Sequence, residues 1–222
     1  MKPVSNGAHD RRLLRGAQSR QAIVRHAVDV ASLDGLDGLS FGRLATDLGV
    51  SKGGIQTLFG TKENLQVAVI EAARGAFEEA VTRPARAQPP GLARLRVLVD
   101  RWIVYAEEPL FPGGCFWAAN LPVFDSQPGP VRNILTRQQR AWRGLIAAEL
   151  RHAADAGEIA AVDADLGAFQ IDAVLTATNT ALRLDDADAA SRARRIIDGF
   201  LAPPAVPRFK RVSEGGLEPP CP

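Results

Sequence analysis

Apolar residues recur along most of the chain at intervals of three and four, which is the period of an amphipathic α-helix. Over residues 19–33, for example, one helical face carries Ile23, Ala27, Val30 and Ala31. Val, Ile and Thr do not gather into alternating runs, and Ala and Leu dominate the sequence. The pattern therefore predicts an all-α protein.

Small hydroxyl residues mark the starts of several helices in the first third of the chain. Their side chains can accept a hydrogen bond from a free backbone N–H group of the first turn. Ser40 precedes a predicted helix over residues 41–48, Ser51 one that ends near Phe59, and Thr61 a long one that ends near Val81. Gly49 ends the first of these helices, as glycine commonly does at a helix C-terminus.

A linker rich in Pro and Gly at residues 84–91 interrupts the pattern. Beyond it, helices are predicted over residues 92–106, 130–156, 163–184 and 187–201. The segment between the first two of these helices is aromatic and rich in Gly and Pro. We expect it to be irregular, with one short helix over residues 115–120.

Composition narrows the class of protein. The chain has 222 residues, of which 46% are hydrophobic and 23% charged, as in globular proteins. It has no apolar run long enough to span a membrane, and its N-terminus lacks the apolar core of a secretory signal. Cys115 and Cys221 make no disulfide framework, and the three histidines show no ligand spacing. We therefore expect a cytoplasmic protein with no metal, no cofactor and no membrane partner.

Charge is unevenly distributed along the chain. Residues 1–62 carry nine Lys or Arg and five Asp or Glu, whereas the remainder carries 18 basic and 20 acidic residues. A basic N-terminal segment ahead of a mildly acidic body is compatible with a polyanion partner for the first part. An ordinary solvated surface would give the same counts.

The second and third predicted helices are joined by a tight glycine turn, which is the helix-turn-helix arrangement. Ile55 and Phe59, four residues apart, are expected to hold the third helix to the core, and Val50 to fill the gap between the two helices. The residues left on the exposed side are Ser51, Lys52, Gly53, Gly54, Gln56 and Thr57. This pattern predicts that the third helix contacts DNA, although a plain three-helix packing unit would also place polar residues outside.

The candidate contacts differ in chemistry. Gln56 can bridge two atoms of an adenine edge, and Lys52 or Thr57 can reach bases or phosphates. Two glycines, Gly53 and Gly54, let the helix backbone come close to DNA. Phosphates are the expected partners of Ser40, Arg43 and Lys62, which lie at the starts of helices.

The stretch LSFGRLATDLGVSKGGIQTLFGTKENLQVAV, residues 39–69, resembles the DNA-binding domain of the TetR family of transcription regulators. The family pattern has an aromatic residue at the position of Gln56, and often one at that of Leu58, so the details of DNA contact differ here. The resemblance implies a helix-turn-helix DNA-binding domain at residues 19–64 and a helical effector-binding and dimerisation domain at 65–201. A flexible basic arm is expected at residues 1–18 and a disordered tail at 202–222.

The resemblance also implies a homodimer formed through the last two helices, a near-palindromic double-stranded DNA operator and a small-molecule effector that releases a repressor from it. Two alternatives stay open. One is an all-α enzyme or small-molecule carrier whose N-terminal helices are structural, and the other is a module that binds a protein partner through the same helices.

Aromatic residues concentrate in the middle of the chain, although they make up only 6% of it. They are expected either to line an apolar pocket for a small apolar or aromatic effector or to pack in the core. The candidate pocket residues are Trp102, Tyr105, Phe111, Phe116, Trp117 and Trp142.

Overall fold

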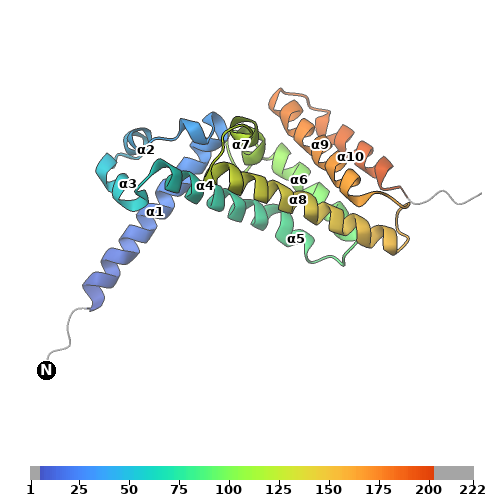
Figure 1. Cartoon of the computed structure of the whole chain (residues 1–222), viewed down its shortest axis with the longest axis horizontal. Coiled ribbons are helices and arrows are strands. Elements are labelled where there is room, and N and C mark those ends of the chain that lie inside the picture. Colours follow the sequence, from blue (N-terminus) through green and yellow to red (C-terminus); the bar gives the residue numbers. More distant parts are fainter. Residues whose placement is uncertain (1–5, 203–222) are drawn as a thin grey trace, which may run out of the picture.

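The computed structural model describes the backbone of residues 6–202 and the side chains of residues 18–202. Within that range all regular structure is helical, as predicted (Figure 1). The elements are α1 (Asn6–Asp34), η1 (Leu36–Gly38), α2 (Phe41–Leu48), α3 (Lys52–Phe59), α4 (Lys62–Phe77), η2 (Glu78–Thr82), α5 (Arg83–Ala85), α6 (Leu92–Glu107), α7 (Phe116–Phe124), α8 (Pro130–Asp155), α9 (Ala164–Arg183) and α10 (Ala189–Phe200).

Two helix bounds differ from the sequence-based expectation. Helix α1 begins at Asn6, so residues 6–18 continue the helix instead of forming a separate arm. Residues 1–5 and 203–222, the rest of the expected arm and nearly all of the expected tail, lie outside the described residues. Helix α7 runs from Phe116 to Phe124, past the expected end at residue 120, and it contains Pro122.

The predicted caps are confirmed at three helix starts. The hydroxyl oxygen of Ser40 accepts a hydrogen bond from the backbone amide of Arg43, and Ser51 and Thr61 cap α3 and α4 in the same way. Gly49 has φ 64°, a left-handed conformation in which glycine is favoured, and it ends α2. The helix-turn-helix is therefore built by the local signals that the sequence carries.

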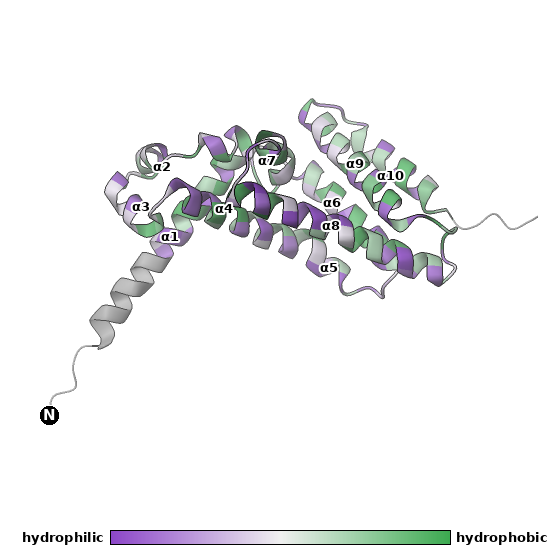
Figure 2. Cartoon of the chain, in the orientation of Figure 1, coloured by the Kyte–Doolittle hydropathy of each residue, from purple (hydrophilic) through white to green (hydrophobic). Residues whose placement is uncertain are grey.

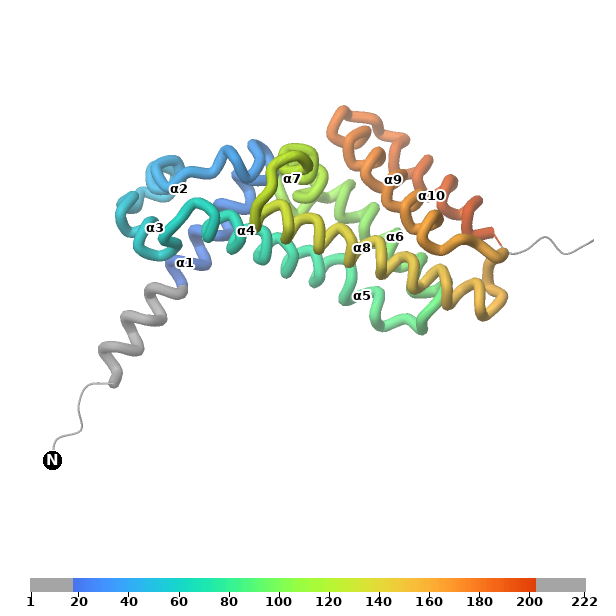
Figure 3. Tube along the Cα trace, in the orientation of Figure 1, coloured from blue at the N-terminus to red at the C-terminus, as the bar shows by residue number. Residues whose placement is uncertain are grey.

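Helices α1–α3 gather at one end of the molecule, and the antiparallel pair α9 and α10 stands at the other (Figures 1 and 3). Helix α4 leaves the first unit and continues through the π-helical turn η2 into α5, alongside the long α8. The expected domain boundary at residues 64 and 65 falls inside α4, so the two units share one continuous helix.

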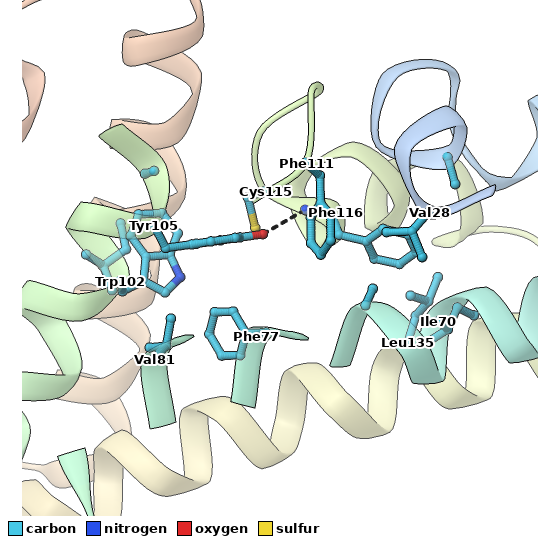
Figure 4. Close-up of a cluster of buried hydrophobic side chains, with 14 of the residues drawn as sticks. Val28, Ile70, Phe77, Val81, Trp102, Tyr105, Phe111, Cys115, Phe116 and Leu135 are labelled. Atoms are coloured by element: carbon cyan, nitrogen blue, oxygen red, sulfur yellow. Dashed lines mark hydrogen bonds between the residues drawn. The ribbon is translucent and has the colours of Figure 1, made fainter. Parts of the chain in front are cut away.

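Hydrophobic and hydrophilic residues alternate along the helices, as Figure 2 shows. No helix in the described part of the chain combines the length and apolarity that crossing a bilayer requires. The apolar faces meet in a core that runs through both units. Figure 4 shows its aromatic part, where the backbone amide of Phe116 donates a hydrogen bond to the Tyr105 hydroxyl at 3.2 Å.

The loop before α7 packs tightly against the end of α1. The backbone amide of Gly113 donates to the Ser32 hydroxyl at 3.0 Å. A Cβ at Gly113 would lie 1.8 Å from the carbonyl oxygen of Ser32, so only glycine fits this approach. Helix α7 is thereby held against α1, in the unit that α1–α3 form.

Candidate nucleic-acid interface and ligand cavity

Helix α3 presents a polar face to solvent. Its inner side is fixed by Ile55 and Phe59, which are 1% and 5% exposed, as predicted. The exposed side carries the expected set, namely Lys52, Gly53, Gly54, Gln56 and Thr57, with Ser51 at the N-terminus. A Cβ at Gly53 would meet no atom within 4 Å, so the backbone there is open to an approaching molecule.

Val50 does not fill the gap between α2 and α3. It is 46% exposed, whereas Leu44, Ala45 and Ile55 are buried and close the space between the helices. The turn itself is held by a hydrogen bond from the backbone amide of Val50 to the carbonyl of Ala45 at 3.0 Å. The prediction for Val50 was wrong because the small Ala45 already lets the helices meet.

The candidate phosphate contacts carry hydrogen bonds within the protein. Arg43 pairs with Asp34 at 2.6 Å, and the Lys62 ammonium donates to the carbonyl of Asp37 at 2.7 Å. Both side chains are exposed, and a surface ion pair such as Arg43–Asp34 contributes little to stability. The hydroxyls of Ser40 and Ser51 act as acceptors in their caps and keep a proton to donate.

The aromatic segment and its neighbours enclose a cavity of about 380 Å³. It lies between the α4–η2 segment and α6, α7, α8 and α9, and its lining includes Trp102, Trp117 and Trp142. These are all three tryptophans of the chain. The other predicted pocket residues, Tyr105, Phe111 and Phe116, lie outside the lining and are 2%, 6% and 0% exposed. They belong to the core, because sequence alone cannot distinguish a ring that faces a cavity from one that packs against other rings.

Phe77 on α4 organises this part of the cavity wall. Its ring makes edge contacts with Trp117 and Trp142, at centroid distances of 5.2 and 5.5 Å, and with Tyr105 at 5.4 Å. Phe77 is not among the pocket residues that the sequence predicted. Further polar lining residues that sequence reasoning missed are Arg74, Glu78, Arg86, Gln139 and Asp172.

A chain of hydrogen bonds links three walls of the cavity. The Trp117 indole donates to Gln138 at 3.1 Å, and Gln138 donates to Glu71 at 3.2 Å. Arg74 bonds Glu71 at 2.8 Å and Glu78 at 2.6 Å. These carboxylates raise the pKa of Arg74, first through the bond to Glu71. The α4 side of the cavity is thus polar but internally paired.

Asp172 on α9 stands in a different environment. Its carboxylate accepts a hydrogen bond from the Gln139 side chain at 2.7 Å. Burial raises its pKa, against the lowering effects of Arg143 and of hydrogen bonds from Trp142 and Gln139. Burial likewise raises the pKa of the Cys115 thiol, which agrees with a structural cysteine and not a reactive one.

Comparison with known proteins identifies the C-terminal part directly. Residues 91–197, from α6 to most of α10, match the sequence model of the family described as "Tetracyclin repressor-like, C-terminal domain". The match identifies this part of the chain as a TetR-type C-terminal domain. The resemblance that residues 39–69 carry at the other end of the chain agrees with this assignment.

Solved structures of TetR regulators share the fold. A regulator from Chloroflexus aurantiacus is 24% identical, with a TM-score of 0.77 over 84% of this chain and 95% of that one. AibR, solved with isovaleryl coenzyme A and operator DNA, is 19% identical, with a TM-score of 0.70 over 83% and 98%. A regulator from Saccharomonospora viridis, solved with choline, is 17% identical, with a TM-score of 0.65 over 83% and 95%. No curated protein matches the sequence.

Proposed function

We propose that the chain is a ligand-responsive DNA-binding transcription regulator, a repressor that a small molecule releases from its operator. The observation that carries the proposal is α3, which is held to the core by Ile55 and Phe59 and presents an open polar face. Such a helix fits the major groove, whose base edges offer donors and acceptors to side chains.

Each exposed residue then has a defined task. Gln56 reads a base edge, and Lys52 and Thr57 reach bases or phosphates. Gly53 and Gly54 let the backbone approach the duplex. Phosphates on either side are held by the group at the helix starts, which consists of Ser40, Arg43, Ser51 and Lys62.

The cavity is the proposed effector site, where a small molecule binds without being converted. Its volume of about 380 Å³ and its mostly apolar wall, which includes three tryptophans, are those of a small-molecule site. Two structural relatives support this assignment, since AibR was solved with isovaleryl coenzyme A and operator DNA and the S. viridis regulator with choline. An effector releases DNA only if it binds the conformation that cannot hold DNA more tightly.

The outer face of α9 and α10 is the proposed dimer interface. Large apolar side chains there are exposed in the single chain, namely Leu166 at 55%, Phe169 at 56% and Ile196 at 56%. A second copy would bury them in a four-helix bundle. Two copies would place their α3 helices about one DNA turn apart, roughly 34–36 Å, on a two-fold symmetric site.

Selection of bound fragments from a random DNA pool, with the full chain, tests the proposal. We expect a near-palindromic site and an affinity that falls steeply as salt rises, because phosphate contacts release counterions. Absence of DNA retention in low-salt buffer would overturn the proposal. Tight binding of a small molecule in that case would favour an all-α carrier or enzyme, and salt-insensitive capture of a protein would favour an interaction module.

A further inference from the structure

We propose that the cavity takes an organic cation with an apolar body, whose positive charge lies against Asp172 and whose body lies against the tryptophan rings. The inference rests on the proposed function only in calling this molecule an effector, since the binding chemistry stands on the cavity alone. It narrows the proposed ligand from any small apolar molecule to a positively charged one.

Four charged side chains line the cavity, namely Arg74, Glu78, Arg86 and Asp172. Arg74 pairs with Glu78 at 2.6 Å and also with Glu71 at 2.8 Å, so its positive charge is fully engaged by carboxylates. Arg86 is exposed, so water screens its charge. Among the described residues, no Lys, Arg or His nitrogen lies within 4.0 Å of the Asp172 carboxylate. Asp172 is therefore the charge that an occupant would meet.

The Asp172 carboxylate is oriented by a hydrogen bond from an uncharged side chain. This neutral donor is the Gln139 amide, which donates to the carboxylate at 2.7 Å. Arg143 acts on it from α8 without an ion pair and lies over the Phe169 ring, 5.9 Å from the centroid. A partly buried carboxylate without a close cation costs stability, and a cationic ligand would compensate that cost.

Three tryptophans form the main aromatic part of the cavity wall. Trp102, Trp117 and Trp142 line the cavity, and tryptophan is the side chain that attracts cations most strongly through its ring quadrupole. An anion would be repelled by the same carboxylate and would gain no such attraction from the rings. A neutral molecule would gain only the burial of its apolar surface. The tryptophan wall and the Asp172 carboxylate thus both favour a positively charged ligand.

The tryptophans also provide the measurement. Because all three line the cavity, the intrinsic tryptophan fluorescence of the full chain reports on its occupancy. We would titrate benzyltrimethylammonium, the neutral N-benzylacetamide and the anion phenylacetate, which share a benzyl body and differ in charge. The cation is expected to bind about tenfold more tightly than either of the others.

Asp172→Asn removes the charge and keeps the shape, so it should reduce the affinity for the cation to that for the neutral probe. Asp165→Asn is the matched control, because it makes the same change on α9 at an exposed residue that pairs with Arg151. A folded Asp172→Asn variant that keeps the cation preference would overturn the inference, as would equal binding of phenylacetate or no cation binding at millimolar concentration. Thermal unfolding of each variant checks the fold.

DNA retention, measured separately on the same samples, distinguishes this inference from the proposed function. Loss of DNA binding with Asp172-dependent cation binding would contradict the regulator proposal alone. DNA binding without cation selectivity would contradict the charge assignment alone.

Discussion

The backbone amide of Leu36 donates a hydrogen bond to the side-chain oxygen of Asn120 at 2.7 Å, and both residues are fully buried. The Asn120 amide nitrogen donates to the carbonyls of Ala31 at 3.1 Å and of Phe116 at 2.8 Å. One side chain on α7 therefore fastens the end of α1, while Trp117 on the same helix lines the cavity. A ligand that displaces α7 would act directly on the first unit through this contact.

Replacing Asn120 with Ala should lower the free energy of unfolding by about 1–3 kcal/mol, because the Leu36 amide and the Ala31 carbonyl would be buried without partners. Denaturant unfolding of the full chain measures the loss. Asn133→Ala, an exposed position on α8, is the matched control and should change little. Equal stability of the two variants would mean that the contact contributes nothing to the fold.

Lys62→Ala and Gln56→Ala should affect DNA binding in different ways. Loss of the lysine removes a phosphate contact, so all sequences should bind more weakly and the salt slope should fall by about 1. Loss of the glutamine should change the base preference, with a cost of roughly 1–3 kcal/mol at one position. Competition binding against a panel of single-base variants measures both. The role assignment fails if the two substitutions act equally on every probe.

Leu166→Asp should break the proposed dimer, because a second copy would have to bury an unpaired carboxylate on α9. Leu33→Asp is a close control, since Leu33 is 57% exposed and Leu166 55%, but Leu33 lies at the end of α1. Sedimentation at micromolar concentration should give a monomer for the first variant and a dimer for the second. A dimer in both cases would move the interface away from this face.

Asp172→Asn should raise the free energy of unfolding of the ligand-free protein at neutral pH. Burial raises the pKa of Asp172, so its protonated form stabilises the fold. That stabilisation is fully present below the ordinary pKa of 3.8 and is lost as pH rises through the raised value. The asparagine stays neutral, so its advantage should shrink as pH falls toward 3.8.

Unfolding curves of both proteins across this range measure the difference. Two other titratable groups interact with Asp172. Arg143 on α8 lowers the pKa of Asp172 because its positive charge favours the carboxylate. The negative charge of Asp172 in turn raises the pKa of the Cys115 thiol. Asp165→Asn should show no such gain, because it only loses a surface ion pair with Arg151. A constant difference between wild type and Asp172→Asn at all pH values would exclude titration of this carboxyl as the cause.

Local signals predicted the helices well because they act within a few residues. The capping hydroxyls, Gly49 and Pro130 determine helix ends by hydrogen bonds and backbone angles that need no distant partner. Helix α7 was predicted too short because its segment is rich in Gly and Pro, whereas here Asn120 and the core contacts of Phe124 support it. Tertiary packing overrides the local preference at this point.

The cavity was only half predictable for a related reason. The tryptophans and the core rings Tyr105, Phe111 and Phe116 are all aromatic, and their positions relative to a cavity depend on how five helical segments meet. The polar residues that line the cavity were harder to predict from the sequence. Asp172 lies between the buried Ile171 and Leu175 of α9, and a carboxylate inside such an apolar stripe was the one hint the sequence offered.

The π-helical turn Glu78–Thr82 determines where the shared helix can change length during evolution. A π turn closes its hydrogen bonds over five residues instead of four, so it holds one residue more than an α turn. Deleting the exposed Glu79 would convert it to regular helix and keep the register on both sides. A deletion elsewhere in α4 would rotate every later residue by about 100° and misalign the cavity wall.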